Sequence, residues 1–263
     1  MSDSLIKCGI SLPFTDIADF RTLDDLPEAF ELVELRGDMA KSASVLQKEH
    51  PVLQEFDFFN FRDLIDSSLT CQLTHENRAI VQEYKKELRE LFSYAHNCGA
   101  ETVGIDPDWE QLSADKNKLE LFNDILRATA GDRENYRIDL AIAVRLPGSG
   151  GIPVKEAAQL LNKLSSHRVK LALDIHPHEL LTTPIEWEKL LTNFRFNTSC
   201  VRFCYASELG NKLLYQHIEP IVRVLKKFRQ SVYVYIAPSG KADFNELADL
   251  INFIGQENQI NES

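Results

Sequence analysis

The sequence predicts an α/β protein built as a single (β/α)₈ TIM barrel, and three observations lead to this prediction. Short, almost continuously apolar runs alternate with longer amphipathic stretches along the 263 residues, as in parallel strands covered by helices on both faces. Eight such pairs leave about 33 residues for each strand and helix, the usual allotment in a barrel of this kind. No glycine-rich fingerprint follows the first apolar run, which argues against a doubly wound dinucleotide-binding sheet.

Strands are expected where short apolar runs are bounded by turn residues. In chain order these runs are Ile6–Leu12, Leu32–Leu35, Phe56–Phe61, Thr102–Ile105, Ile138–Arg145, Val169–Ile175, Val201–Tyr205 and Val232–Ala237. Their nearly continuous hydrophobicity is typical of strands that are buried on both faces.

Helices are expected between these strands, and Glu76–Asn97 has the clearest pattern. Its apolar residues recur at steps of three and four, at Ile80, Tyr84, Leu88, Leu91 and Ala95, which indicates one buried helix face. Gly99 is well placed to end this helix, because glycine readily adopts the left-handed conformation of a C-cap. The other expected helices are Ala40–Lys48, Ser113–Ala130, Pro153–Ser165, Pro184–Asn193, Asn211–Phe228 and Phe244–Ile254.

Composition and charge exclude some kinds of binding partner and cellular location. The formal net charge is −11, a field that repels phosphate backbones, so no nucleic-acid partner is expected. No apolar run reaches the roughly 18 residues of a membrane span, and no basic secretory signal opens the sequence. Five cysteines without C-x-x-C spacing predict reduced thiols in a cytoplasmic protein. We expect one domain over residues 1–263 with a polar tail at 256–263, and the sequence leaves homo-oligomer formation open.

Candidate site residues stand where strands end, because barrel active sites lie at the carboxyl ends of the strands. The catalytic candidates are Arg145, Asp174, His176, His178 and Glu208. The substrate-binding candidates are Glu34, Arg36, Asp106, Trp109, Tyr205, Ser239, Gly240 and Lys241. Glu34 and Arg36 alternate along one strand face, where each could pair with the other or with a residue of a neighbouring strand.

Four stretches resemble the xylose isomerase-like barrels, a family of sugar and sugar-phosphate isomerases and epimerases with a DNA-repair endonuclease branch. They are VELRGD (Val33–Asp38), AHNCGAETVGIDPD (Ala95–Asp108), IDLAIAVRLPG (Ile138–Gly148) and VKLALDIHPHE (Val169–Glu179). The resemblance follows strand order over nearly the whole chain. It implies a TIM barrel, but activity has to be argued from the site, because one fold hosts many functions.

The resemblance also implies where a metal would bind. Family members hold one divalent cation with Glu, Asp, His and Glu side chains from strands 5 to 8. These positions fall on Ala143, Asp174, Tyr205 and Ala237 in this sequence. Two methyl groups and a phenol are poor ligands for a hard cation, so we expect neither the family's metal nor another cofactor.

Two alternatives stay open. A relocated metal would need Asp174, His176, His178 and Glu208 to assemble an imidazole-rich site. A type I 3-dehydroquinate dehydratase is the other, because Val33–Arg36, Arg145 with Gly150-Gly151, and His178 with Thr183-Pro184 resemble segments of those barrels. That family requires a lysine that forms an imine, and the matching position carries Arg202, which cannot form one.

Arg145 would supply the positive charge of a metal-free site, either by stabilising an oxyanion or by pairing with Asp174 or Asp106. Ser239, Gly240 and Lys241 precede the last predicted helix, with Asp243 as its N-cap, and this turn could hold a phosphate. Trp109 could stack on a sugar ring, although Asp106–Trp109 also reads as a helix cap. The sequence thus predicts a divergent barrel that takes a small polyhydroxylated or phosphorylated molecule, either as a metal-independent isomerase or epimerase or without catalysis.

Overall fold

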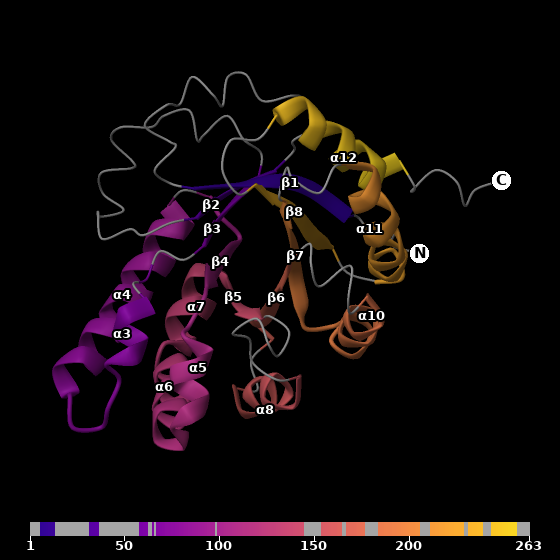
Figure 1. The fold of residues 1–263 in the computed structure, drawn as a ribbon. Coiled ribbons are helices and arrows are strands. Elements are labelled where there is room, and N and C mark those ends of the chain that lie inside the picture. Colours follow the sequence, from indigo (N-terminus) through magenta and orange to yellow (C-terminus); the bar gives the residue numbers. More distant parts are fainter. Residues whose placement is uncertain are drawn as a thin grey trace. The chain divides into compact units, whose positions relative to one another are not determined.

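The computed structural model describes residues 6–13, 32–36, 58–62, 65, 67–97, 99–144, 154–164, 167–176, 184–205, 211–228, 231–238 and 243–256. The strands are hydrogen-bonded neighbours in the order β1 to β8, as in a TIM barrel, which confirms the predicted fold class; Figure 1 labels the elements. The chain divides into two compact units, Met1–Glu34 with Ala172–Ser263, and Leu35–Leu171, which are described in turn. The predicted helix Ala40–Lys48 lies outside the described residues.

The first unit contains the strands at the two ends of the chain. They are β1 (Ile6–Pro13), most of β2 (Leu32–Arg36) and of β6 (Val169–Ile175), β7 (Thr198–Tyr205) and β8 (Val232–Pro238). Parallel pairing places Ile6–Ile10 of β1 beside Val232–Ile236 of β8, and Cys200–Tyr205 of β7 beside Tyr233–Pro238. The helices of this unit are α10 (Pro184–Asn193), α11 (Asn211–Leu225) and α12 (Phe244–Gln256).

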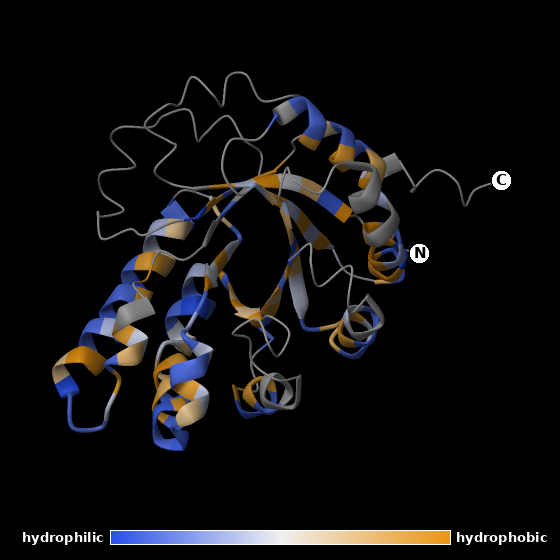
Figure 2. Ribbon diagram, viewed as in Figure 1, coloured by the Kyte–Doolittle hydropathy of each residue, from blue (hydrophilic) through white to orange (hydrophobic). Residues whose placement is uncertain are grey.

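The strands of this unit are buried as their sequences predict. Every residue of β8 is buried, and β7 is buried except for the half-exposed Cys204. Figure 2 shows apolar residues concentrated on these strands, while the helices carry polar residues along one side. β7 starts at Thr198, three residues before the predicted Val201. The apolar pattern missed this start because Thr198 and Ser199 are polar, although both are buried.

The second unit contains β3 (Phe58–Arg62), β4 (Thr102–Ile105) and β5 (Asp139–Val144), with α3 (Ser67–Cys71), α4 (Arg78–Asn97), α5 (Trp109–Ala114), α6 (Lys116–Ala128), α7 (Ala130–Tyr136) and α8 (Val154–Leu164). The buried face of α4 includes Tyr84, Leu88, Leu91 and Ala95, as its periodicity predicts, whereas Ile80 is half-buried. The Tyr84 ring meets the edge of the Phe122 ring on α6 at a centroid separation of 6.2 Å.

The predicted helix Ser113–Ala130 is wrong as a single element, because capping residues divide it. Asp115 has an extended backbone and accepts a hydrogen bond from Asn117, which starts α6. The buried Arg133 of α7 donates through Nη1 to the Leu126 carbonyl at 2.8 Å, so a cation closes the carbonyl end of α6. Gly99, at φ +80°, ends α4 as expected, with its N–H donating to the His96 carbonyl. None of the described helices combines the length and the apolar character needed to cross a bilayer.

Gly9 of β1 lies directly against Leu32 of β2, so that an added methyl group would collide with the Leu32 side chain and carbonyl. We expect Gly9→Ala to lower the free energy of unfolding by about 1–3 kcal/mol, because the clash involves backbone that cannot yield cheaply. Gly131→Ala is the matched control, since nothing surrounds that position in α7 and alanine favours a helix by up to about 1 kcal/mol. Urea denaturation of both variants measures the difference, and equal stability would contradict the close packing at Gly9.

Candidate functional site

A buried cluster of charged side chains lies within the first unit and is centred on Arg202 of β7. Its Nε donates to Oε1 of Glu34 on β2 at 2.5 Å, and its Nη2 donates to the other Glu34 oxygen. Its Nη1 donates to Oδ1 of Asp174 on β6 at 3.2 Å. One guanidinium therefore joins the carboxylates of two different strands, and it holds Glu34 with the two-pronged geometry that arginine favours.

Two further side chains complete the cluster. Ser11 of β1 donates its hydroxyl to Oε1 of Glu34 at 2.7 Å. The Tyr235 ring of β8, which pairs in register with Arg202, lies 5.9 Å from the guanidinium carbon, within the range of a cation–π contact. Five strands thus contribute one residue each, as expected where alternate side chains of a barrel turn inward.

Burial decides how this cluster behaves electrostatically. Arg202, Glu34 and Asp174 are only 1 to 2% exposed, so each charge is held away from water. Burial alone would lower the pKa of Arg202, but the acidic groups near it, Glu34 and Asp174 among them, outweigh that effect and raise the pKa. The guanidinium therefore stays charged, and one positive charge faces two carboxylates.

The faces of β7 correct the sequence alignment of strand 7. Side chains alternate along a strand, so Cys204 shares the inward face of Arg202 and is paired in register with Ala237. Tyr205 faces the other way, and its hydroxyl donates to Glu246 of α12 at 3.0 Å. Burial and the Glu246 hydrogen bond raise the pKa of Tyr205 to about 12. The inward residue near the end of β7 is thus Cys204, one place before the expected Tyr205.

These residues do not fit the divalent metal that the family resemblance implies. Ala143 and Ala237 offer buried methyl groups, Asp174 already accepts from Arg202, and Cys204 offers a thiol, a soft ligand. Across the described parts of the chain, no three His, Cys, Asp or Glu side chains gather in a way that could hold a metal ion. The charged residues of this cluster form an internal ion-pair network, in which Arg202 pairs with Glu34 and Asp174.

Among the other candidates, His176 follows β6 directly and is half-buried, and Arg36 is half-buried at the end of β2. The remaining candidates lie outside the described residues, namely Arg145, His178, Glu208, Ser239, Gly240 and Lys241. Asp174 accepts a hydrogen bond from Arg202, and the expected pairing of Arg145 with Asp174 or Asp106 stays a prediction. Glu34 pairs with a residue of strand 1, as expected, and also with Arg202. An arginine within the otherwise uncharged TSCVRFCY of β7 was the signal in the sequence for this cluster.

Asp106, Asp108 and Trp109 follow β4 in the second unit. Asp108 caps α5 by accepting from the Gln111 backbone N–H at 3.0 Å, which confirms the capping interpretation. Trp109 is 2% exposed and donates from Nε1 to the Ala143 carbonyl at 2.7 Å. The indole of Trp109 is therefore buried in the packing of this unit, and its stacking on a sugar stays a prediction. Asp106 is half-buried.

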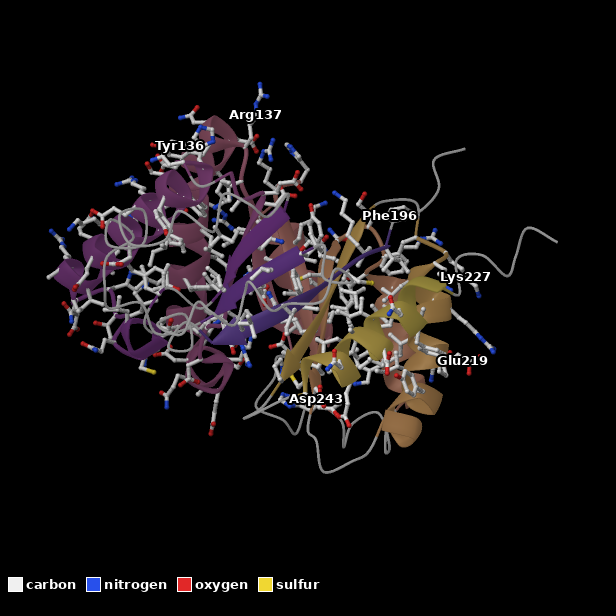
Figure 3. The ribbon with its side chains drawn as sticks, turned by 90° about the horizontal axis from the view of Figure 1, so that it is seen from above. Tyr136, Arg137, Phe196, Glu219, Lys227 and Asp243 are labelled. Atoms are coloured by element: carbon white, nitrogen blue, oxygen red, sulfur yellow. The ribbon has the colours of Figure 1, made fainter. Side chains whose placement is uncertain are left out.

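The start of α12 bears on the expected phosphate site. Asp243, labelled in Figure 3 at the beginning of this helix, accepts from the Asn245 backbone N–H at 2.9 Å, which confirms the predicted N-cap. Glu246 adds a second carboxylate in the first turn. Two negative charges at a helix N-terminus occupy the place that would attract a phosphate.

Comparison with known proteins supports the fold. Neither a family model nor a curated protein sequence matches the chain. A solved D-tagatose 3-epimerase-like protein aligns with a TM-score of 0.65 at 13% identity, over 97% of this chain and 99% of its own. An AP endonuclease of family 2 from Brucella melitensis gives 0.65 at 18% identity, over 94% and 98%. A 3-keto-D-glucoside 4-epimerase from E. coli gives 0.65 at 11% identity, over 96% and 100%. The chain thus has the TIM-barrel fold of these proteins.

Arg202→Met tests the buried cluster. We expect the free energy of unfolding to fall by about 3–5 kcal/mol, because the substitution leaves two buried carboxylates without their cation. Arg223→Met is the control, since Arg223 pairs with Glu219 on α11 but is 67% exposed, and such a pair contributes about 0–1 kcal/mol. If urea denaturation finds the same loss in both variants, the cluster does not stabilise the fold.

The loop after β4 gives a second prediction, about Cys71. Its thiol donates to Oδ2 of Asp108 at 3.3 Å, and burial followed by the Asp108 carboxylate raises its pKa. Asp108→Asn removes the negative charge but keeps a good N-cap. We therefore expect Cys71 to form thiolate more readily and to be alkylated several-fold faster at mildly alkaline pH.

Mass-spectrometric mapping of the alkylated peptide follows Cys71 separately from the other cysteines. Asp115→Asn, which changes the cap of α6, is the matched control and should leave the Cys71 rate unchanged. An unchanged or slower rate in Asp108→Asn would contradict the effect assigned to this carboxylate.

Proposed function

We propose that this chain is a sugar isomerase/epimerase-like barrel that binds a small polyhydroxylated molecule without a divalent metal. The observation that carries the proposal is the pairing of Asp174 and Glu34 with Arg202. Metal-assisted isomerases need free carboxylates to hold the cation that polarises the substrate. Here the carboxylate at the strand-6 position is bonded to a guanidinium, which supports ligand binding without metal-assisted chemistry.

Charge favours a neutral ligand over a phosphorylated one. The formal net charge is −11, and Asp243 and Glu246 stand at the start of α12, next to the turn from which a phosphate site was expected. An anion would be repelled by both. The same net charge disfavours DNA as a ligand, although an AP endonuclease is among the proteins of similar fold.

A metal-independent isomerase is the second candidate, and His176 is the observation in its favour. Imidazole side chains are common general acids and bases in enzymes, and His176 lies directly after the strand that carries Asp174. In this version His176 would move a proton on the bound sugar while no metal takes part. Turnover that is lost in His176→Gln with binding retained would favour this candidate.

Metal content and thermal shift of the wild-type protein test the proposal. Protein purified without chelators or metal-affinity resin is expected to contain no stoichiometric Mn²⁺, Co²⁺ or Zn²⁺. Adding Mn²⁺ should leave its melting temperature unchanged, whereas a specific ligand at 100 times its Kd would stabilise the fold by about 2.7 kcal/mol. A panel of neutral sugars should contain at least one that raises the melting temperature, and the corresponding sugar phosphates should bind more weakly.

Asp174→Asn is the control for the metal experiment, because it removes the one carboxylate at a matching ligand position while conserving shape. Metal near one equivalent in the wild type that disappears in Asp174→Asn would overturn the metal-free proposal. A panel in which no sugar binds would overturn the ligand class.

A further inference from the structure

We infer that the Arg202 side chain is a built-in substitute for a bound cation, so that its removal would convert Glu34 and Asp174 into a binding site for a free cation. This goes beyond the proposed function, because it concerns what holds the interior of the barrel together and not which ligand the barrel takes.

The acceptors around Arg202 have the number and arrangement of a cation site. Glu34 presents both carboxylate oxygens to one edge of the guanidinium, and Asp174 presents one to another nitrogen. Three oxygens from two strands thus converge on one cationic group. A converging set of carboxylate oxygens is also what hard metal ions bind, but the positions are filled here by a planar group with five N–H donors.

Both carboxylates are buried. Glu34 and Asp174 are 1% and 2% exposed, so neither carboxylate can exchange its partner for water. An isolated buried carboxylate either takes up a proton or acquires a counter-ion. With two of them beside one another and no arginine, a free cation that enters would relieve both.

Glu34 has a second partner besides Arg202, and an aromatic ring lies beside the guanidinium. Ser11 donates to Glu34 from β1, and the Tyr235 ring faces the guanidinium from β8. A hydrogen-bonded carboxylate and an aromatic ring remain when the arginine is shortened, and an aromatic face also attracts organic cations. The vacated space should therefore suit a guanidinium ion best, because that ion has the shape of the group removed.

The experiment is chemical rescue of Arg202→Ala. We expect a clear fall in melting temperature, which millimolar guanidinium chloride partly reverses and sodium chloride at the same ionic strength does not. Glu34→Gln/Asp174→Asn/Arg202→Ala is the matched control, since it has the same cavity without the two negative charges. It should show no rescue. Rescue by sodium chloride alone, or equal rescue of the control, would overturn the inference.

Arg202→His gives a second test, a gain of metal binding, which can be made even if Arg202→Ala folds poorly. It places an imidazole beside Glu34 and Asp174, a ligand set that suits Mn²⁺ or Zn²⁺. We expect close to one equivalent of metal by elemental analysis, with a higher melting temperature on metal addition, and none in the wild type or in Asp174→Asn/Arg202→His. Absence of metal from Arg202→His, together with absence of rescue or of folding in Arg202→Ala with guanidinium, would overturn the inference. Sugar binding is measured on the wild type, so its failure leaves these results unaffected.

Discussion

The buried guanidinium of Arg202 is the constraint on which the interior of the first unit depends. Placing two carboxylates at 1 to 2% exposure is strongly unfavourable unless a cation accompanies them. Arg202 satisfies both and joins β7 to β2 and β6 by hydrogen bonds. One side chain therefore links the order of these strands, the inward direction of their side chains and the charge balance of the cluster. A change in one of these affects the others.

The same cluster illustrates why the fold alone does not determine the function. Proteins with this fold include an epimerase and an endonuclease at identities of 11 to 18%, where likeness shows the fold alone. Ala143 and Ala237 remove two of the family's expected ligands, and Arg202 engages Asp174. Apolar strands are enough for the barrel fold, whereas chemistry depends on a few inward residues.

Much of the fold could be predicted from the sequence, because apolar runs and helical periodicity are local. Thr102–Ile105, Val169–Ile175 and Pro184–Asn193 have the bounds expected. Ser113–Ala130 was predicted as one helix because its apolar periodicity continues past Asp115. The N-cap that Asp115 makes divides it in the structure. The cluster was less accessible, because the partner of Asp174 is set by strands that are distant in the sequence. The family resemblance placed the inward ligand position of strand 7 on Tyr205, one residue from Cys204, and a one-residue shift reverses the direction of every side chain.

An attached cation also differs from a bound one in how it is supplied. A metal ion has to be acquired after synthesis, competes with other ions and can be withdrawn by chelators. The positive charge held by Glu34 and Asp174 is part of the polypeptide, so it is present at one per molecule as soon as the chain folds. The ion pairs of Arg202 with Glu34 and Asp174 thus form without a metal ion having to be acquired.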